Sequence, residues 1–557
     1  MSRDMIKSEK TTMNGRRGFC SRNCMTGSVI CVALSSLAMF VIFWCTNIFR
    51  DSILSGLEIR NGTLMFDWWV RPPVRPAYRV RIFNYTNVKE FESGKAEKLR
   101  VEEVGPYVYR ETLTPDDEIV TVPNVPLLAA VAFVRDMGFV ARVGLTAILG
   151  TIQAKPFVDI PAGGFLWGYD NQVFELAKPI ISWQENIPFD KFGILAIKNG
   201  LSKDRITIKT GQDDINNLGL FEQLNGRKSR DVWGDEKCDK IEGTDGTMFP
   251  PNLVQDLNSS LKVYSQDMCR TLTLRYHGHG NAQGMPTLTY KPPIDTMTTS
   301  ATKDNCYCPK TNPSSPNSKR SCPPAGVFNS SVCSFNLPIV TSFPHFYAAD
   351  QKLLDTIDGL NPRAHLHESA IEIHPRLGVP IGGHSRLQMN MEVRTAVGVP
   401  FLGKLKDGTI IPLVWIEIAI DSVPQFMLDV FHNAYFTAGA VEAGMQWASL
   451  VGIVFCICSV ICMLKKSHRE RHGGLRRNVS GENPLIDIYL HRRSIISLHE
   501  RKIIFVGIEL EQVSGSTLII NRSISTSVLE HGKHRGFGFK TANVKIFFVI
   551  NLCRLVS

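Results

Sequence analysis

The sequence lacks a complete catalytic or nucleotide-binding motif. His367-Glu-Ser-Ala-Ile371 begins like a zinc-protease helix, but isoleucine stands where the second histidine ligand must be. Gly383-His-Ser-Arg-Leu387 resembles a nucleophile elbow without its closing glycine. A glycine-rich phosphate loop with its lysine is also missing. We therefore expect no catalytic residue, no bound metal and no cofactor, and we predict that the protein is not an enzyme. An ecto-hydrolase is disfavoured because the sequence offers no nucleophile with its catalytic partners.

Charge is missing from two long apolar runs in this chain of 557 residues, Gly27 to Phe49 and Ala443 to Leu464. At about 1.5 Å per residue, a helix over either run is long enough to cross a hydrocarbon core of roughly 30 Å. A cleavable signal peptide is the alternative for the first run. Its apolar region would be about 7–15 residues long and would end at small residues, whereas this run ends in Ile48 and Phe49. We predict a retained signal anchor.

The net charge of +10 is concentrated beside the outer ends of these two runs. Lys465 and Lys466 follow the second run at once, and six basic residues precede the first: Arg3, Lys7, Lys10, Arg16, Arg17 and Arg22. Positive charge marks the cytosolic side of a membrane span, so we place both termini in the cytosol and expect no nucleic-acid partner. The predicted segments are a cytosolic tail 1–26, a transmembrane helix 27–49, an ectodomain 50–442, a transmembrane helix 443–464 and a cytosolic tail 465–557.

The predicted ectodomain carries the sequence marks of an oxidising compartment. Four glycosylation sequons lie within it, at Asn61, Asn84, Asn258 and Asn329. Six of the 14 cysteines also lie there, and an even number fits a disulfide framework whose connectivity the spacing leaves open. They are Cys238, Cys269, Cys306, Cys308, Cys322 and Cys333. Half a zinc site at Cys306-Tyr-Cys308 is the alternative, but zinc pairs usually have more residues between the ligands.

Three further cysteines lie near the predicted cytosolic face of the membrane: Cys20, Cys24 and Cys462. Reversible palmitoylation is one interpretation. Packing of small apolar side chains in lipid is the other.

The ectodomain is predicted to consist mainly of strands. Apolar and polar residues alternate in Arg79–Phe83, Arg205–Lys209, Thr271–Arg275 and Leu387–Val393, as expected for half-buried strands. Thr409–Ile420 is a more continuously apolar strand, suited to a position that is buried on both sides.

The segment Leu127–Lys155 predicts a helix broken near Gly138 or Gly144. Arg135 and Arg142 are seven residues apart and would share one helix face. An ordinary buried helix with two solvated arginines is one interpretation. An apolar surface with a basic rim that captures amphipathic anions is the other.

Five motifs, in this order along the chain, resemble the class B scavenger receptor family. They are Glu103-Val-Gly-Pro-Tyr-Val-Tyr-Arg-Glu111, Val122-Pro-Asn-Val-Pro-Leu-Leu128, Leu166-Trp-Gly-Tyr169, Gly246-Thr-Met-Phe-Pro-Pro251 and His345-Phe-Tyr-Ala-Ala-Asp350. The family includes fatty-acid and lipoprotein receptors, a lysosomal integral membrane protein and insect sensory neuron membrane proteins. The resemblance runs from about residue 27 to 466.

The resemblance implies a mainly β fold with some α: a twisted antiparallel β-barrel ectodomain with a lipid tunnel and an apical helical bundle, anchored by two transmembrane helices. It also implies the disulfides Cys238–Cys306, Cys269–Cys333 and Cys308–Cys322. Leu127–Lys155 falls where the bundle begins, which favours ligand capture by Arg135 and Arg142, and Lys155 corresponds approximately to the family's basic apical region. Two stretches depart from the family pattern: residues 110–122 are shorter, and residues 465–557 are longer. The tail contains Glu482-Asn-Pro-Leu-Ile486, which approximates a dileucine sorting signal.

The predicted function is a membrane glycoprotein at the plasma membrane that binds lipids, fatty acids, sterols or lipoproteins and transfers lipid to the membrane. An endolysosomal sorting receptor for a soluble cargo protein is the alternative within the family, and a homo-oligomer is compatible with either. A ligand-gated cation channel with two spans is a further alternative from another class. A channel of that kind needs polar side chains along its pore. It is disfavoured because the second run is otherwise apolar and has mainly Gln446, Ser449 and Ser459 as polar side chains.

Overall fold

The computed structural model describes residues 25–108, 118–184, 190–302, 304–310 and 319–479. The chain divides into two compact units, one made of Met1–Phe49 with Glu442–Ser557 and the other of Arg50–Val441. The predicted tails and Glu482–Ile486 lie mostly or entirely outside the described residues, as do residues 109–117 of the shortened stretch.

Among the described residues, two helices are long and apolar enough to cross a membrane, Met25–Cys45 and Gln425–His472. The first was expected to continue to Phe49, but it ends in a π-helical turn at Val41–Cys45 because Thr46 adopts an extended conformation. The second contains α13 (Gln425–His432), a π-helical turn (Asn433–Thr437) and the start of α14 (Ala438–Val479).

Within the first unit the two helices touch through polar atoms as well as apolar ones. The indole of Trp44 donates to the carbonyl of Gln446 at 3.2 Å, and the Gln446 amide donates to the carbonyl of Phe43 at 2.9 Å. Gly452 faces Ser36 so closely that a Cβ atom would overlap the serine hydroxyl. Small residues permit this approach, as is usual for helix pairs in membranes.

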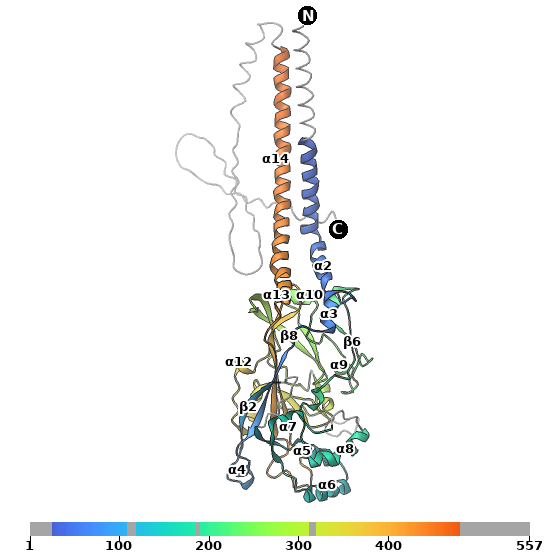
Figure 1. Cartoon of the computed structure of the whole chain (residues 1–557), viewed down its shortest axis with the longest axis vertical. Helices are drawn as coiled ribbons and strands as arrows, with labels where there is room; N and C mark the ends of the chain where they lie inside the picture. The colour runs from blue at the N-terminus through green and yellow to red at the C-terminus, as the bar shows by residue number, and fades with distance from the viewer. Residues whose placement is uncertain (1–24, 109–117, 185–189, 303, 311–318, 480–557) are drawn as a thin grey trace, which may run out of the picture. The chain divides into compact units, whose positions relative to one another are not determined.

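An eleven-stranded sheet forms the framework of the Arg50–Val441 unit (Figure 1). Its path is β12 (Ile357–Asp358), β2 (Leu99–Val108), β1 (Ala77–Tyr85), β15 (Ile410–Ile420), β14 (Pro380–Glu392), β13 (Ala370–Ile373), β9 (Met285–Lys291), β8 (Arg270–Ala282) and β7 (Leu261–Ser265). A branch adds β11 (Ile339–Ser342) to β14 and β10 (Val327–Asn329) to β11. Two further pairs stand apart: β3 (Ile119–Pro123) with β4 (Phe157–Pro161), and β5 (Ile206–Ile208) with β6 (Phe221–Leu224).

The predicted strands are confirmed at each of the five positions, in β1, β5, β8, β14 and β15. The pairing is antiparallel except between β12 and β2. β15 lies between β1 and β14, and its first half is buried without alternation, as its continuous apolar run predicts. The expected closed barrel is not found: among the described residues, hydrogen bonding runs from β12 to β7 without joining these two edges.

Four helices gather at one end of this unit (Figure 1). They are α5 (Val125–Arg135), α6 (Phe139–Thr151), α7 (Ala162–Trp167) and α8 (Gln172–Gln184). The Asn124 side chain caps α5 by accepting from the amide of Leu127 at 3.3 Å. The predicted break near Gly138 is confirmed, because α6 begins directly after that glycine. Arg135 and Arg142 consequently belong to two different helices, and the expectation that they share one helix face is wrong.

The helices α3 (Leu64–Val70), α10 (Pro251–Gln255) and α13 lie at the other end of the unit (Figure 1). The Thr63 hydroxyl caps α3 through the amide of Phe66. Short helices complete the unit: α2 (Ile48–Leu54, which begins just before it), α4 (Val88–Ser93), α9 (Glu236–Asp239), α11 (Gln351–Leu354) and α12 (Ala364–His367).

The largest hydrophobic cluster joins the centre of the sheet to the four-helix end, through residues such as Phe83, Val131, Phe165 and Val414. A second cluster lies between α13 and the strands near it and includes Leu57, Met248, Ile381 and Phe431. These two clusters pack against opposite ends of the same sheet, so each end has its own hydrophobic core and its own surface.

Candidate functional site

A cavity of about 800 Å³ opens within the Arg50–Val441 unit, beside α3 and α13. Its wall is mainly apolar and includes Trp68 and Trp69 from α3 and Val430 and Phe431 from α13. Four flexible methionines also line it: Met65, Met248, Met297 and Met427. The volume falls within the range of sites that enclose small apolar ligands. The arrangement therefore suits a hydrophobic molecule.

Charged side chains are nearly excluded from this wall. Among the described residues that line it, Asp245 is the one carboxylate, and none is a lysine or an arginine. His384 also contributes, but burial lowers its pKa, which favours the uncharged imidazole. No polar cluster able to activate a substrate accompanies these groups in the described lining.

Strand alternation separates this apolar wall from a charged face. Glu417 on β15 is in register with Arg79 on β1 and Arg386 on β14, and none of the three lines the cavity. The Glu417 carboxylate accepts from Arg79 at 3.1 Å and from Arg386 at 2.7 Å. Burial raises the pKa of Glu417, but the two arginines outweigh burial and hold the pKa below its usual value. The charges are thus paired with each other, away from the cavity.

A second cluster brings Glu103, His345 and His367 together, and their ligand-type atoms lie within 4.8 Å of one another. The two imidazoles stack at 4.5 Å, and Nε2 of His345 lies 2.7 Å from the Glu103 carboxylate. Nδ1 of His345 accepts the amide of Asn361, and Nδ1 of His367 accepts the amide of Arg363. In neutral rings both Nε2 atoms therefore carry hydrogen, which leaves them no lone pair for a metal. We interpret the cluster as a hydrogen-bonded support and not as a metal centre.

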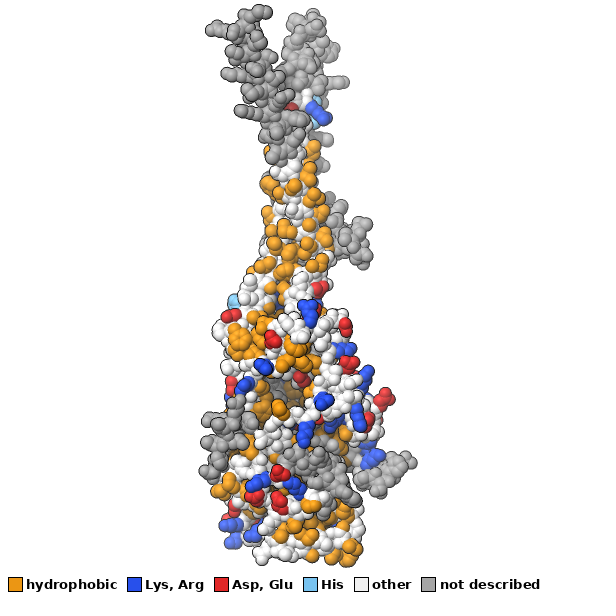
Figure 2. Space-filling view, turned by 45° about the vertical axis from the view of Figure 1, so that its right-hand side comes forward, with side chains coloured by type: hydrophobic (Ala, Val, Ile, Leu, Met, Phe, Trp, Pro, Cys, Tyr) orange, Lys and Arg blue, Asp and Glu red, His pale blue; other side chains and the backbone are white. Residues whose placement is uncertain are grey.

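The four-helix end presents exposed apolar side chains, and Figure 2 shows hydrophobic atoms gathered at this end. On α5, α6 and the turn between them these are Phe133, Met137, Phe139, Val140, Val143 and Ile148, with Val140 82% exposed. We call these six residues the apical patch. Exposed apolar patches in soluble regions commonly mark binding surfaces.

The three predicted ligand-binding residues take different positions around the apical patch. Arg135 forms an ion pair with Asp407 at 2.7 Å, so its charge is already neutralised. Arg142 on α6 is half-buried, and its Nε atom has no hydrogen-bond partner in the structure. Lys155 is exposed after the end of α6, and its backbone carbonyl accepts from Asn124. Of these three, Arg142 is the one that belongs to α6, the helix that carries four residues of the apical patch.

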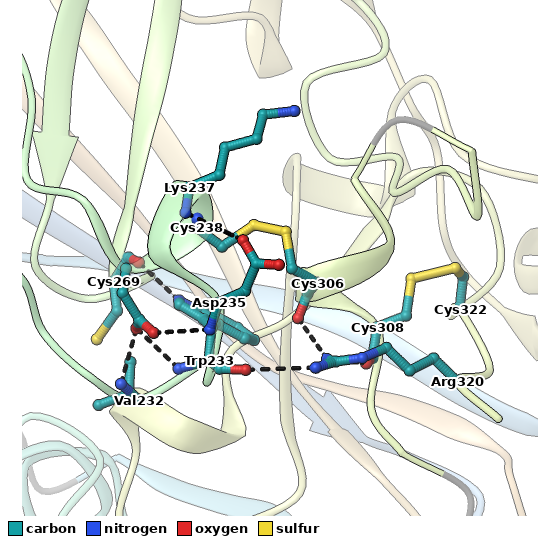
Figure 3. The surroundings of a disulfide bond; sticks show 11 residues. Val232, Trp233, Asp235, Lys237, Cys238, Cys269, Cys306, Cys308, Arg320 and Cys322 are labelled. Atoms are coloured by element: carbon teal, nitrogen blue, oxygen red, sulfur yellow. Dashed lines mark hydrogen bonds between the residues drawn. A yellow bond between two sulfur atoms is a disulfide. The ribbon is translucent and has the colours of Figure 1, made fainter. Parts of the chain in front are cut away.

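The six ectodomain cysteines lie together in three pairs, Cys238–Cys306, Cys269–Cys333 and Cys308–Cys322. These are the pairs that the resemblance implies. Arg320 lies beside two of them and donates to the carbonyls of Cys306, Cys308 and Trp233 (Figure 3). Because Cys306 and Cys308 are both in disulfides, the alternative of a zinc half-site is wrong.

Comparison with known proteins decides the relationship. The model of the CD36 family matches residues 27–118 and 113–464. This chain belongs to the CD36 family. Its curated relatives include scavenger receptors of class B and lysosome membrane proteins, as the sequence motifs indicate.

The CD36 family relatives match most of their own length. Lysosome membrane protein 2 of Homo sapiens is 29% identical over 401 residues, which cover 65% of this chain and 79% of the relative. Scavenger receptor class B member 1 of Sus scrofa is 27% identical over 414 residues, 69% of this chain and 78% of the relative. The Mus musculus protein of the same name is 26% identical over 471 residues, which cover 78% of this chain and 88% of the relative. This chain is therefore a scavenger receptor-like membrane protein, and the scavenger receptors of the CD36 family are receptors and not enzymes.

The modification sites predicted for this CD36 family member differ in accessibility. Asn61 and Asn258 are exposed, whereas Asn84 is half-buried and its carbonyl oxygen accepts the amide of Thr121. Asn329 is only 5% exposed, and its side-chain oxygen accepts from Ser331. Cys462 is free and exposed on α14, and Cys20 and Cys24 lie outside the described residues.

Sequence reasoning identified neither the residues of the cavity wall nor the histidine pair, although the resemblance implied a lipid tunnel. The wall residues come from segments as distant as α3 and α13, and no local pattern connects them. One signal was present in the alternation along each strand. Tyr78 and Ser385 directly precede Arg79 and Arg386, and Ile418 directly follows Glu417, so the two sets belong to opposite faces of the sheet. Reading that alternation across three strands requires the register, which only the fold supplies.

Proposed function

We propose that this protein is a class B scavenger receptor that binds lipids, fatty acids, sterols or lipoproteins and passes lipid to the membrane without catalysing a reaction. Residues 50–442 would lie outside the cytosol between transmembrane helices at 27–49 and 443–464. The tails 1–26 and 465–557 would be cytosolic. The observation that carries the proposal is the apolar cavity beside α3 and α13, in a chain of the CD36 family.

The physical benefit of such a cavity follows from the hydrophobic effect. Each methylene group gains about 0.8 kcal/mol on leaving water. A chain of about sixteen carbons therefore costs roughly 12 kcal/mol to return to water. An apolar enclosure lowers that barrier by replacing water with side-chain contacts, and it needs no nucleotide.

The proposed path begins at the apical patch, where Arg142 would attract an anionic ligand and the exposed apolar side chains would receive its hydrocarbon part. It would continue through the unit as a tunnel to the cavity. The cavity lining contains no residue of α5 to α8, so the proposal requires the connecting passage to open during transfer.

The experiment measures uptake of labelled fatty acid and sterol by cells that express the protein. Ile418 lines the cavity, and Ile418→Trp would fill part of it. Ile119 on β3 is 60% exposed and does not line the cavity, so Ile119→Trp is the matched control. We expect Ile418→Trp to reduce uptake severalfold and Ile119→Trp to leave it unchanged at equal surface expression. Wild-type uptake equal to that of untransfected cells would contradict the proposal.

A second candidate function is sorting of a soluble cargo protein in endosomes or lysosomes. The similarity to lysosome membrane protein 2 favours it. Microscopy of the tagged full-length protein separates the two: surface staining supports lipid uptake at the plasma membrane, and staining of acidic compartments supports cargo sorting.

A further inference from the structure

Two buried histidines connect two separate segments of the cavity wall. Phe343 lines the cavity, and His345 follows it by two residues. Ser369 also lines the cavity, and His367 precedes it by two residues. The rings of His345 and His367 stack at 4.5 Å, and the two residues are 6% and 3% exposed. One pair of stacked side chains therefore holds both wall segments.

The hydrogen bonds of these two rings require the neutral form. The backbone amide of Asn361 donates to Nδ1 of His345 at 3.1 Å, and the amide of Arg363 donates to Nδ1 of His367 at 2.9 Å. A neutral imidazole has one nitrogen that accepts, and a protonated imidazole has none. Protonation would place an N–H group of the ring against the amide N–H group and break the bond. Both amides precede α12 directly, so the two rings hold the same segment.

The charged groups around the rings act in opposite directions. Glu103 lies 2.7 Å from Nε2 of His345 and favours a charged ring, but Arg81 pairs with Glu103 at 3.1 Å and offsets part of its charge. Burial is the largest influence on His367 and lowers its pKa to about 4. It is assisted by the charges nearest that ring, which belong to His345, Arg386 and Arg363. A ring released from this environment would regain the ordinary pKa of 6.5, so acid favours release.

The backbone at His345 also favours movement once the ring is free. His345 and Phe346 have φ values of 53° and 54°, in the left-handed region that residues with side chains rarely adopt. Gln388 supports this conformation by accepting the amide of His345 at 2.6 Å, and the ring bonds of His345 support it as well. Loss of the ring bonds would allow the segment to relax, and Phe343 belongs to the same segment.

We propose that His345 and His367 form an acid-sensitive latch on the cavity wall. In an acidic compartment, protonation breaks the bonds from the two backbone amides, the wall segments at Phe343 and Ser369 move, and the cavity releases its ligand. Proton uptake by the released rings drives the change. The release of ligand rests on the proposed function, whereas the opening of the latch does not.

Hydrogen exchange tests the latch without any ligand. The full-length protein is reconstituted in phosphatidylcholine vesicles. The readout is the protection of the peptide containing Asn361 and Arg363, relative to the unfolded chain at the same pH. For His367 alone, the difference between 6.5 and about 4 corresponds to about thirtyfold between about pH 7.5 and about pH 5. We expect protection to fall at least about fivefold, and protection that does not depend on pH would overturn the inference.

Asparagine variants separate a latch from a purely structural support. Asparagine offers an oxygen in place of Nδ1 and does not titrate, so His345→Asn together with His367→Asn retains an acceptor for each amide. We expect the double variant to keep the same protection at both pH values, and each single variant to lose part of the pH dependence. His365→Asn, at an exposed position of α12, is the matched control and should behave as wild type. Wild-type pH dependence in the double and single variants would overturn the assignment.

Photolabelling tests the release of ligand. Photoreactive hexadecanol is the probe, because an alcohol stays uncharged over this pH range. The readout is the concentration that half-saturates labelling of the peptide containing Ile418. We expect it to rise severalfold from about pH 7.5 to about pH 5 in wild type and to stay constant in the double variant. His384 also lines the cavity, and burial lowers its pKa. Loss of the pH dependence in His384→Gln alone would assign the response to that histidine and overturn release by the latch.

The outcomes separate the latch from the proposed function. Absence of saturable labelling at both pH values would overturn the proposed function and the release of ligand, while hydrogen exchange still decides the latch. Reduced protection at acidic pH with unchanged labelling would overturn the action of the latch on the cavity. Constant protection and constant labelling would overturn the whole inference and leave lipid binding intact.

Discussion

Glu103 receives interactions from three segments that are distant in the chain. Arg81 lies 3.1 Å from its carboxylate, His345 lies 2.7 Å from it, and the indole of Trp415 donates to it at 2.9 Å. Burial raises the pKa of Glu103, but these partners outweigh burial and lower the pKa overall. One carboxylate thus connects β1, β2 and β15 with the segment around His345.

We predict that Glu103→Gln lowers the free energy of unfolding by about 1 kcal/mol, because a charge-assisted network that solvent partly screens becomes a neutral one. Urea unfolding of the detergent-solubilised protein measures this. Glu102→Gln at the exposed neighbouring position is the matched control and should change little. Equal stability of the two variants would show that the network is not stabilising.

Two buried histidines make stability depend on pH. Burial lowers the pKa of His367 to about 4, assisted by the charges of His345, Arg386 and Arg363 and opposed by Glu103. Burial likewise lowers the pKa of His374 to about 4, assisted by Arg376. Between the ordinary pKa of 6.5 and this value, the unfolded chain binds protons that the folded chain does not.

We therefore predict that the melting temperature falls as the pH decreases from about 6.5 to about 4. Below about pH 4.5, protonation of Glu103 and Glu417, whose pKa values are lowered in the fold, acts in the same direction. Thermal denaturation of the full-length protein across this range tests the slope. His367→Gln should flatten it, whereas His365→Gln at an exposed position should not. A melting temperature independent of pH would refute this interpretation.

At the scale of secondary structure, the parallel contact between β12 and β2 depends on a glycine. Gly359 follows β12 with a φ of 96°, and a Cβ atom there would overlap the carbonyl oxygen of Val101. Gly226 has a similar φ of 77° but open space around it. Substitution at both positions therefore introduces backbone strain, whereas steric overlap arises only at Gly359.

We predict that Gly226→Ala costs about 1 kcal/mol of stability, from the left-handed conformation alone. Gly359→Ala should cost clearly more, since β2 must also move away. Chemical denaturation of both variants provides the comparison. Equal losses would mean that the contact at Val101 relaxes without cost.

The two arginines beside the apical patch, Arg135 and Arg142, lead to a prediction. Because Asp407 already neutralises Arg135, reversing its charge should affect stability more than ligand capture. Arg142→Glu should weaken binding of anionic lipid vesicles severalfold and reduce its salt dependence. Vesicle flotation at low and high salt measures both effects. Identical binding by Arg142→Glu and wild type would remove Arg142 from the proposed capture site.

At the scale of the whole molecule, the burial of the sequons predicts which ones are occupied. Asn61 and Asn258 are exposed, and Asn329 is buried. A folded ectodomain has room for a glycan only at exposed asparagines. We predict that Asn61→Gln and Asn258→Gln each increase gel mobility and that Asn329→Gln does not. Treatment with a glycosidase should remove the differences. A complete lack of glycosylation would contradict the proposed location of residues 50–442.

Features with a local physical cause could be predicted from the sequence. Strand alternation, the broken helix near Gly138 and the charge-free spans depend on neighbours along the chain, and the structure contains the corresponding strands and helices. The end of the first helix at Cys45, instead of Phe49, shows the limit of hydropathy, because apolar character does not specify backbone conformation.

The amino-acid sequence by itself indicated the family through the order of its motifs. It also determined the strand pattern and the chemical character of each segment, since composition and periodicity are local properties. Only the tertiary structure decided that Asp407 neutralises Arg135, that Asn329 is buried and that Tyr78 and Ser385 flank Ile418 in an apolar cavity. The reason is that burial and pairing arise where strands and helices from opposite ends of the chain meet, and their register is absent from any single segment.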